Sequence, residues 1–303
     1  MVSTAATAAS ARSPLARQIT WAGYLSVLPA MVLLLLLSGV PVILALVLSF
    51  TDYSLIQAPH WLGLANYHLL VTDNTFATSV ARSAEFVVMI VPSGTLISLL
   101  VALLLRSSIR GIGAIRTIVY IPQGISWVAT ALIWSWLYNP IYGLIDYVLT
   151  SVGIAPVAWT TDFNTAMLSI VIMSIWRDIG FFGIIFLAAL QGIPQSMYEA
   201  AAIDGANRFQ TFRGITIPLL GPTLFFVVVI WTIGGMQMFA QAFVLTNGGP
   251  VDATQTIVYT IYLTAFQFLK MGYASAQAFA LFVVIVILTL VNRRLFRDQE
   301  YEL

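Results

Sequence analysis

Long apolar segments alternate with polar segments along most of this chain. A stretch of about 20 apolar residues is long enough to cross a membrane as a helix. Six such stretches occur, at about residues 25–50, 83–105, 116–137, 166–190, 218–240 and 275–295. The pattern therefore predicts an all-α integral membrane protein with six transmembrane helices. The third is the least regular, because Pro122 lies inside it and aromatic residues crowd its end.

The two ends of the chain differ from this apolar pattern. Residues 1–20 are small and polar and predict a disordered tail, and residues 298–303 predict a second tail. The first apolar stretch, from Leu25 to Phe50, is too long for the apolar core of a signal peptide, which has about 7–15 residues. We therefore expect one transmembrane domain over residues 21–297.

One further apolar run, IVYTIYLTAFQFL at residues 257–269, is shorter than a transmembrane helix. It is amphipathic and aromatic, and it ends next to Lys270. These features favour a short helix lying at the membrane interface. The alternative is a seventh, poorly formed transmembrane segment.

Basic residues are distributed unevenly between the two sides that six helices would create. Cytoplasmic segments of membrane proteins carry an excess of Lys and Arg. With the N-terminus inside, ten of the thirteen Lys and Arg fall in cytoplasmic segments. We therefore expect both termini in the cytoplasm. These ten residues are Arg12, Arg17, Arg106, Arg110, Arg116, Arg208, Arg213, Arg293, Arg294 and Arg297.

Composition excludes several classes of protein. Only 8% of the residues are charged and the mean hydropathy is +0.94, whereas a soluble domain has about 25% charged residues. The net charge of +1 gives no field that would attract nucleic acid. There are no cysteines, so thiol catalysis and Cys-ligated metal sites are excluded. Only His60 and His68 are histidines, and we expect no metal site, no cofactor and no catalytic residues.

A polar loop, EAAAIDGANRFQTFRGITIP at residues 199–218, separates the fourth and fifth apolar stretches. The segment from Glu199 to Ala202 has high helix propensity, and Asp204-Gly205 is a turn signal. Residues 207–213 can form a second short helical turn. The loop therefore predicts a helix–turn–helix at the cytoplasmic face. An ordinary amphipathic loop on the lipid surface is the alternative.

Several segments resemble the permeases of binding-protein-dependent ABC importers, and most closely their carbohydrate, or maltose-type, branch. The loop at residues 199–218 resembles the EAA motif of that family. The other matching segments are SFTDYSL (49–55), WLGLANY (61–67), LAALQGIPQSMYEAAAIDGA (187–206) and LTNGGPVDATQTIVYTIY (245–262). The resemblance extends from about residue 25 to 295, and it implies the type I importer fold.

The resemblance also implies a role for the loop. In this family the EAA loop is a coupling helix that docks in a groove of a separate ATP-hydrolysing subunit. Glu199 would accept contacts from an arginine of that subunit, and Gly205 would form the turn. The residues implied in coupling are Glu199, Ala200, Ala201, Asp204, Gly205 and Ala206. No phosphate-binding GxxxxGK[ST] sequence occurs, so the chain itself is expected to be a transport subunit and not an enzyme.

The partners implied by the resemblance are a second related permease, an ATPase dimer and an external substrate-binding protein. The implied location is the cytoplasmic membrane of a bacterium or archaeon. Closure of the ATPases would move the coupling helices and switch the path between inward-facing and outward-facing states.

Two adjacent charges, Arg177 and Asp178, lie inside the fourth apolar stretch. Charges in a membrane helix are costly and usually face a protein interior or a water-filled path. Ser174 shares their helix face, because the spacing is i, i+3 and i+4. Each charge either lines a path or pairs with a neighbouring helix, and the two roles are compatible.

Maltose-type permeases that bind sugar in the membrane do so from their third, fourth and fifth helices. The resemblance places the corresponding positions at Gln123 and Trp127, at Ser174, Arg177 and Asp178, and at Trp231, Gly235 and Met238. Gly235 and Met238 are less polar than is usual for sugar contacts. Plain helix packing is the alternative for Trp127, Trp231 and Met238.

The leading hypothesis is a permease subunit of an ATP-driven importer for a mono- or oligosaccharide. The same machine importing glycerol phosphate or a glycerophosphodiester is an alternative, because Arg177 would suit an anion, although Asp178 beside it argues against that. A stand-alone secondary transporter predicts an inverted repeat, and none is evident. A membrane enzyme would need a cluster of acid–base or metal-binding residues, which the sequence does not suggest.

Overall fold

The computed structural model of the chain describes residues 14–107 and 109–296, and the regular structure in these residues is helical. Four helices are long and apolar enough to cross a membrane: Trp21–Leu48, Asn74–Leu105, Phe163–Gly192 and Met271–Arg294. Two sharply bent helix pairs raise this number to six if each pair counts as one crossing. The predicted all-α architecture is confirmed, but two of the six expected helices are broken.

The first crossing consists of α1 (Pro14–Leu34), a π-helical turn η1 (Leu35–Gly39) and α2 (Val40–Leu48). The helix begins at Pro14, so the expected disordered tail of residues 1–20 is wrong for its last part. Proline suits the first turn of a helix, because the missing N–H has no partner there anyway. Residues 1–13 and the expected tail at 298–303 lie outside the described residues.

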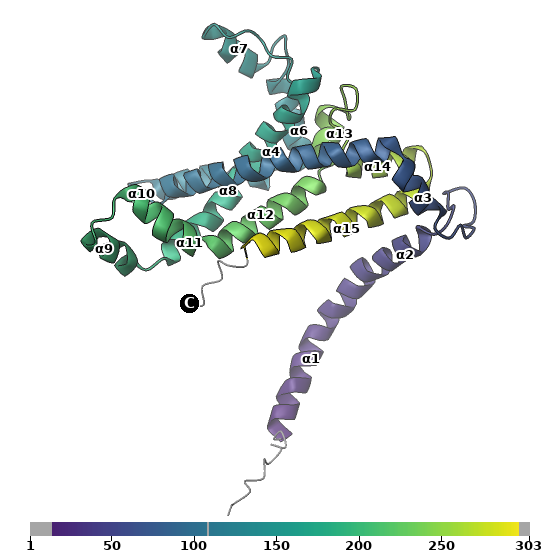
Figure 1. Cartoon of the computed structure of the whole chain (residues 1–303), viewed down its shortest axis with the longest axis horizontal. Helices are drawn as coiled ribbons and strands as arrows, with labels where there is room; N and C mark the ends of the chain where they lie inside the picture. Colours follow the sequence, from purple (N-terminus) through teal and green to yellow (C-terminus); the bar gives the residue numbers. More distant parts are fainter. Residues whose placement is uncertain (1–13, 108, 297–303) are drawn as a thin grey trace, which may run out of the picture.

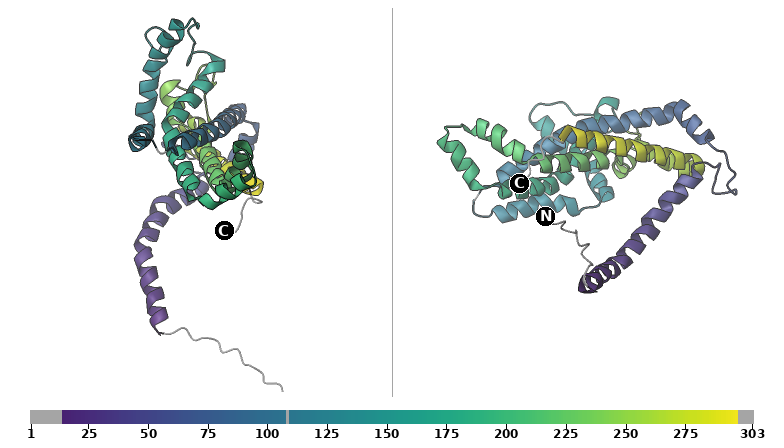
Figure 2. Two further views of the ribbon diagram at one scale, coloured as in Figure 1. Left: turned by 90° about the vertical axis from the view of Figure 1, so that its left-hand side faces the viewer. Right: turned by 60° about the horizontal axis from the view of Figure 1, so that its bottom comes forward.

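This first crossing stands apart from the rest of the molecule (Figures 1 and 2). None of the residues in its most apolar stretch is buried. Its main contacts with the other helices are made by α2 against α15 (Met271–Phe296). The surface of α1 is therefore available to lipid or to another protein.

The centre of the molecule is formed by α4 (Asn74–Leu105), α8 (Phe163–Gly192) and α12 (Gly221–Met236), with α15 packed on α12. Small residues let membrane helices approach closely, and packing then stabilises their association. Gly183 of α8 faces Val101 of α4 in this way. The buried side chains of this core include Phe86, Ile90, Leu99, Phe186, Leu190 and Val227.

The third expected helix, 116–137, is not continuous. It consists of α5 (Ile112–Tyr120), a 3-10 turn η2 (Ile121–Gly124) and α6 (Trp127–Leu137), and the two parts meet at 101°. Pro122 lies in the turn, where its missing N–H weakens the helical ladder. Ser126 then adopts an extended conformation and accepts a hydrogen bond from the N–H of Ala129, which starts α6. The sequence located the irregularity but not its size.

The fifth expected helix, 218–240, is also divided. The segment α10 (Arg208–Thr211), η3 (Phe212–Thr216) and α11 (Ile217–Leu219) meets α12 at 67°. The main helix α12 ends at Met236 and not at residue 240. After this break the chain continues as the short helix α13 (Ala240–Leu245).

The remaining helices are short. They are α3 (Ala65–Thr72), α7 (Leu144–Ser151), α9 (Gln195–Ile203) and α14 (Ile257–Tyr262), the last followed by a π-helical turn η4 (Leu263–Gln267). The short helix expected at 257–269 is formed by α14 and η4. Ile257, Tyr259 and Thr260 are buried, since α14 packs against α4 and α15.

Candidate functional site

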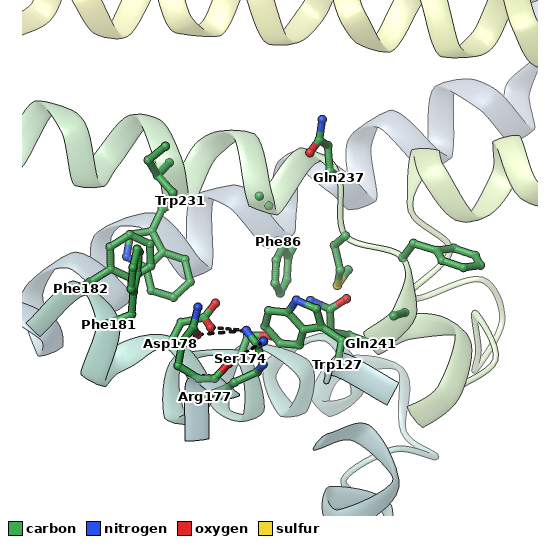
Figure 3. A pocket seen from close by; sticks show the side chains of 17 residues that line it. Phe86, Trp127, Ser174, Arg177, Asp178, Phe181, Phe182, Trp231, Gln237 and Gln241 are labelled. Atoms are coloured by element: carbon green, nitrogen blue, oxygen red, sulfur yellow. Dashed lines mark hydrogen bonds and ion pairs between the residues drawn. The ribbon is translucent and has the colours of Figure 1, made fainter. Parts of the chain in front are cut away.

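A cavity of about 430 Å³ lies where α4, η2, α6, α8, α12 and α13 converge (Figure 3). The eight residues predicted for a substrate path come from three separate parts of the chain. All eight line this one cavity: Gln123, Trp127, Ser174, Arg177, Asp178, Trp231, Gly235 and Met238. The structure therefore brings the predicted set together.

Arg177 is held by a dense set of contacts inside the protein. Its Nε donates to the carbonyl oxygen of Ile125 at 2.9 Å, and its Nη2 donates to that of Gln123 at 3.1 Å. Its Nη1 donates to Oε1 of Gln123 at 3.1 Å and to Oδ1 of Asp178 at 2.6 Å. The guanidinium also lies over the ring of Trp127, 4.1 Å from its centroid.

These contacts follow from the break in the third helix. Outside a regular helix, the carbonyls of Gln123 and Ile125 need other donors, because an unpaired backbone group is costly in a membrane protein. Arg177 supplies those donors, and Asp178 balances its charge. The side chains of Arg177 and Asp178 are only 11% and 14% exposed. Arg177 therefore pairs structurally with the broken third helix and also lines the cavity.

Three of the predicted residues on and after α12 are mainly packing residues. Trp231 stacks on Phe182 with 4.5 Å between ring centroids, and its indole covers Gly94 so closely that a Cβ there would lie 2.9 Å from the ring. A Cβ at Gly235 would lie 2.9 Å from a methyl group of Val87. Met238 is 1% exposed. These positions form one wall of the cavity and offer few polar contacts.

The sequence analysis missed two polar residues of the cavity. Gln237 and Gln241 line it as well, from the break after α12 and from α13. They add two uncharged amide groups to the lining. Two glutamines at the end of the apolar stretch 218–240 were a polar signal that could have identified them.

The polar loop folds as the predicted helix–turn–helix. The helix α9 ends at Ile203, and the cap residue Asp204 is followed by Gly205 with φ of +75°. The N–H of Ala206 donates to the carbonyl of Ala201 at 2.9 Å, and the N–H of Gly205 donates to that of Ala202 at 3.2 Å. This pair of bonds is a Schellman motif, which satisfies carbonyls at a helix end.

The second half of the turn has its own cap. The side chains of Asn207 and Gln210 each accept from the other's backbone N–H, at 2.9 and 2.8 Å. This capping box satisfies N–H groups at the start of α10. Local sequence chemistry therefore determines both the end of α9 and the start of the next helix.

The loop exposes most of the residues implied in coupling. Glu199, Ala200, Asp204 and Gly205 are exposed, Ala206 is half-buried and Ala201 is 8% exposed. Among the described residues, none forms a salt bridge with Glu199. The apolar side chains of Ile203 and Phe209 beside it are 87% and 69% exposed.

Tyr198 fixes this loop to the helical core. Its hydroxyl lies 3.4 Å from Nη1 of Arg106, which follows α4, and 3.3 Å from Oγ1 of Thr216 in η3. The loop lies at the opposite end of the molecule from α3 and α14 (Figure 1). The loop therefore offers an exposed surface, and Tyr198 links it to the end of α4, one of the helices that line the cavity.

We predict that Gly205→Ala weakens the turn. Alanine at a positive φ costs about 1 kcal/mol. No atom would lie within 4 Å of the new Cβ, so no steric clash adds to this cost. Amide hydrogen exchange in α9 should accelerate about fivefold. The control is Gly192→Ala, where the residue is helical and again has nothing within 4 Å. Equal exchange rates in the two variants would contradict the prediction.

Comparison with known proteins identifies the family. The family described as binding-protein-dependent transport system inner membrane component matches residues 94–300. The chain belongs to this family. It is a multi-pass membrane protein and a transport subunit, so neither a stand-alone secondary transporter nor a membrane enzyme describes it.

Individual relatives match most of the chain. It is 35% identical to a probable ABC transporter permease, YesP, of Bacillus subtilis, over 94% of this chain and 92% of that one. It is 34% identical to the trehalose/maltose transport system permease MalF of Thermococcus litoralis, over 91% and 93%. It is 35% identical to the sn-glycerol-3-phosphate transport system permease UgpA of Agrobacterium fabrum, over 76% and 78%.

A solved structure shows the same fold. One chain of a bacterial ABC transporter involved in alginate import superposes with a TM-score of 0.82, over 95% of this chain and 99% of that chain. The sequence identity between the two is 24%. The type I importer fold expected from the resemblance is confirmed.

Proposed function

We propose that this permease forms, with a second related permease, the membrane path for a neutral mono- or oligosaccharide. One observation carries the substrate class: the central cavity combines aromatic rings with uncharged hydrogen-bonding groups, and its charges are already paired. Trp127 offers a ring face to the apolar side of a sugar. Gln123, Ser174, Gln237 and Gln241 offer groups that bond hydroxyls.

The chemistry of Arg177 argues against an anionic substrate. A phosphate site needs a cation with free donors aimed at the ligand. In this cavity the guanidinium donates to two carbonyls, an amide oxygen and a carboxylate. Sequence identity alone does not distinguish the two substrates, because a relative named for trehalose and maltose is 34% identical and one named for sn-glycerol 3-phosphate is 35% identical, the second over a smaller part of the chain. The paired charges therefore favour the sugar over glycerol phosphate.

Three partners belong to this proposal. An external binding protein delivers the sugar, separate ATPase subunits bind the loop around Glu199, and a second permease packs beside this one. The first crossing is an argument for the second permease. Its α1 stands apart from the remaining helices, and its most apolar stretch has no buried residue (Figure 2). We place both termini in the cytoplasm of a bacterium or archaeon, since most basic residues then lie inside.

The proposed coupling uses the contacts of the loop. Movement of the ATPases shifts α9, and Tyr198 connects α9 to Arg106 at the end of α4 and to η3. The helix α4 lines the cavity, and η3 continues through α11 into α12, which lines it as well. The broken third and fifth helices provide places where the bundle bends as it alternates between its two states.

The test is Glu199→Gln in the complete transporter, reconstituted in lipid with both permeases, the ATPase and the binding protein. The change removes the charge but keeps the side chain's shape. Because one charge-assisted hydrogen bond is lost, ATP hydrolysis stimulated by the binding protein should fall about tenfold. Sugar uptake should fall in parallel.

The matched control is Glu85→Gln, which removes a carboxylate paired with Arg82 on α4, far from the loop. This control should hydrolyse ATP at the rate of the unmodified transporter. An unchanged rate in Glu199→Gln would contradict the proposed contact.

In the same vesicles, excess sn-glycerol 3-phosphate should leave sugar uptake unaffected, and competition would support the alternative substrate.

A further inference from the structure

The break after α12 places two glutamine side chains at the central cavity. Gln237 follows α12 directly, Gln241 lies in the first turn of α13, and both line the cavity. Gln237 is exposed, and its amide points away from Trp127 (Figure 3). Gln241 is only 7% exposed and lies beside Trp127, since α13 packs against α6 (Figure 3). Gln241 is therefore a buried amide on the wall of the cavity.

The amide of Gln241 has no partner within the protein. Neither its Oε1 nor its Nε2 forms a hydrogen bond with any residue in the ranges that the structure describes. A buried amide without a partner is costly, and native structures rarely leave one unsatisfied. Its two polar atoms are not enclosed, in contrast to Nε1 of Trp231, which belongs to the same lining. A molecule in the cavity can therefore reach the amide of Gln241.

The backbone at the break does not depend on this amide. The hydroxyl of Thr256 donates to the carbonyl oxygen of Met238 at 2.7 Å. The N–H groups of Gln237 and Met238 donate to carbonyls one turn earlier in α12. Thr256 thus supplies at this break the donor that Arg177 supplies at the break in the third helix. No hydrogen bond gives Gln241 a part in holding the broken helix.

The packing of α13 fixes where Gln241 lies. Ala242 and Leu245 of this helix are buried in the central core, and α13 packs against α6, which begins with Trp127. The guanidinium of Arg177 covers one face of the Trp127 ring, 4.1 Å from its centroid. Only the opposite face of the indole is left for a sugar ring to stack on, and α13 holds Gln241 next to this indole.

An unpaired amide recognises a particular chemistry. Its Nε2 donates and its Oε1 accepts, so hydroxyl groups, which do both, satisfy the two atoms together. An ionised phosphate oxygen only accepts and leaves Oε1 unpaired. A site that bonds a hydroxyl discriminates against a ligand without it, because the polar group of the protein then stays buried and unpaired. The amide of Gln241 can therefore select between ligands as well as bind them.

We infer, on the basis of the proposed sugar transport, that Gln241 is a specificity-determining residue that bonds hydroxyls of a sugar ring stacked on Trp127. The polar groups across the cavity are committed to each other, since Arg177 donates to both Gln123 and Asp178. Loss of a hydroxyl that Gln241 bonds weakens binding, whereas loss of a hydroxyl elsewhere on the ring does not. Selection in the membrane thus adds to selection by the binding protein.

The experiment is photo-crosslinking of a diazirine derivative of D-glucose to the complete transporter in lipid nanodiscs, with peptide mapping and competition by unlabelled sugars. We expect label in the peptides around 123–127 and 230–241. Gln241→Met keeps the length of the side chain but removes both hydrogen-bonding groups, and it should lower this labelling about tenfold. In the unmodified transporter, one monodeoxy derivative of D-glucose should compete about tenfold less well than D-glucose. In Gln241→Met the two sugars should compete equally, because the missing hydroxyl no longer has a partner.

The control is Gln267→Met, which removes an exposed amide from η4 that does not line the central cavity. It should label and compete as the unmodified transporter does. Labelling of Gln241→Met at the unmodified level overturns the inference, and so does the same order of the deoxy sugars with and without Gln241. Equal competition by all monodeoxy sugars in the unmodified transporter also overturns it, whether or not the variant folds. Absence of label from the whole chain instead contradicts the proposed sugar substrate.

Discussion

Gly180→Ala is expected to destabilise the permease severely, whereas Gly183→Ala on the same helix should be tolerated. A Cβ at Gly180 would overlap the carbonyl oxygen of Val119 and lie 2.6 Å from its carbonyl carbon and 2.9 Å from Cα of Tyr120. These are backbone atoms of α5 and cannot rotate away. Overpacking of this kind costs about 3 kcal/mol. The apparent melting temperature in detergent should therefore fall by several degrees.

Gly183→Ala is the matched control, because both glycines lie on α8 three residues apart. A Cβ at Gly183 would meet Cγ1 of Val101 at 3.3 Å, and this side chain can move by a few tenths of an ångström. We expect a change in stability below about 1 kcal/mol. If the two variants melt at the same temperature, the close approach of α5 to α8 is not as the structure has it.

Arg177→Met is the second change with a large expected effect. It removes the hydrogen bonds to Ile125, Gln123 and Asp178 and leaves a buried carboxylate without a partner. Breaking a buried pair by removing one member costs about 3–5 kcal/mol. We therefore expect reduced thermal stability and loss of uptake. Fluorescence-detected size exclusion after heating measures the first and vesicle uptake the second.

The double variant, Arg177→Met with Asp178→Asn, separates two effects of this change. It removes the unpaired charge, so part of the stability should return. The carbonyls of Gln123 and Ile125 still lack their donors, so uptake should stay low. A variant Arg177→Met that melts like the unmodified protein, with only a higher KM for sugar, would show Arg177 to be a sugar ligand and not a brace for the broken helix.

The sequence alone determined those features that depend on neighbouring residues. Apolar stretches of membrane length predicted the crossings. The turn at Gly205 was predictable because a left-handed residue after a run of alanines needs glycine. The eight cavity residues were found from the family resemblance and their helical spacing, and they do lie together.

Only the tertiary structure decided how distant segments meet. Arg177 contacts residues 52 and 54 positions away in the chain, so its partners could not be deduced from periodicity. The size of the breaks at 101° and 67°, and the burial of Ile257 against α4 and α15, depend on the same kind of contact. Local sequence determines a segment's preference, whereas contacts between segments determine its bend, its burial and the partners of its polar groups.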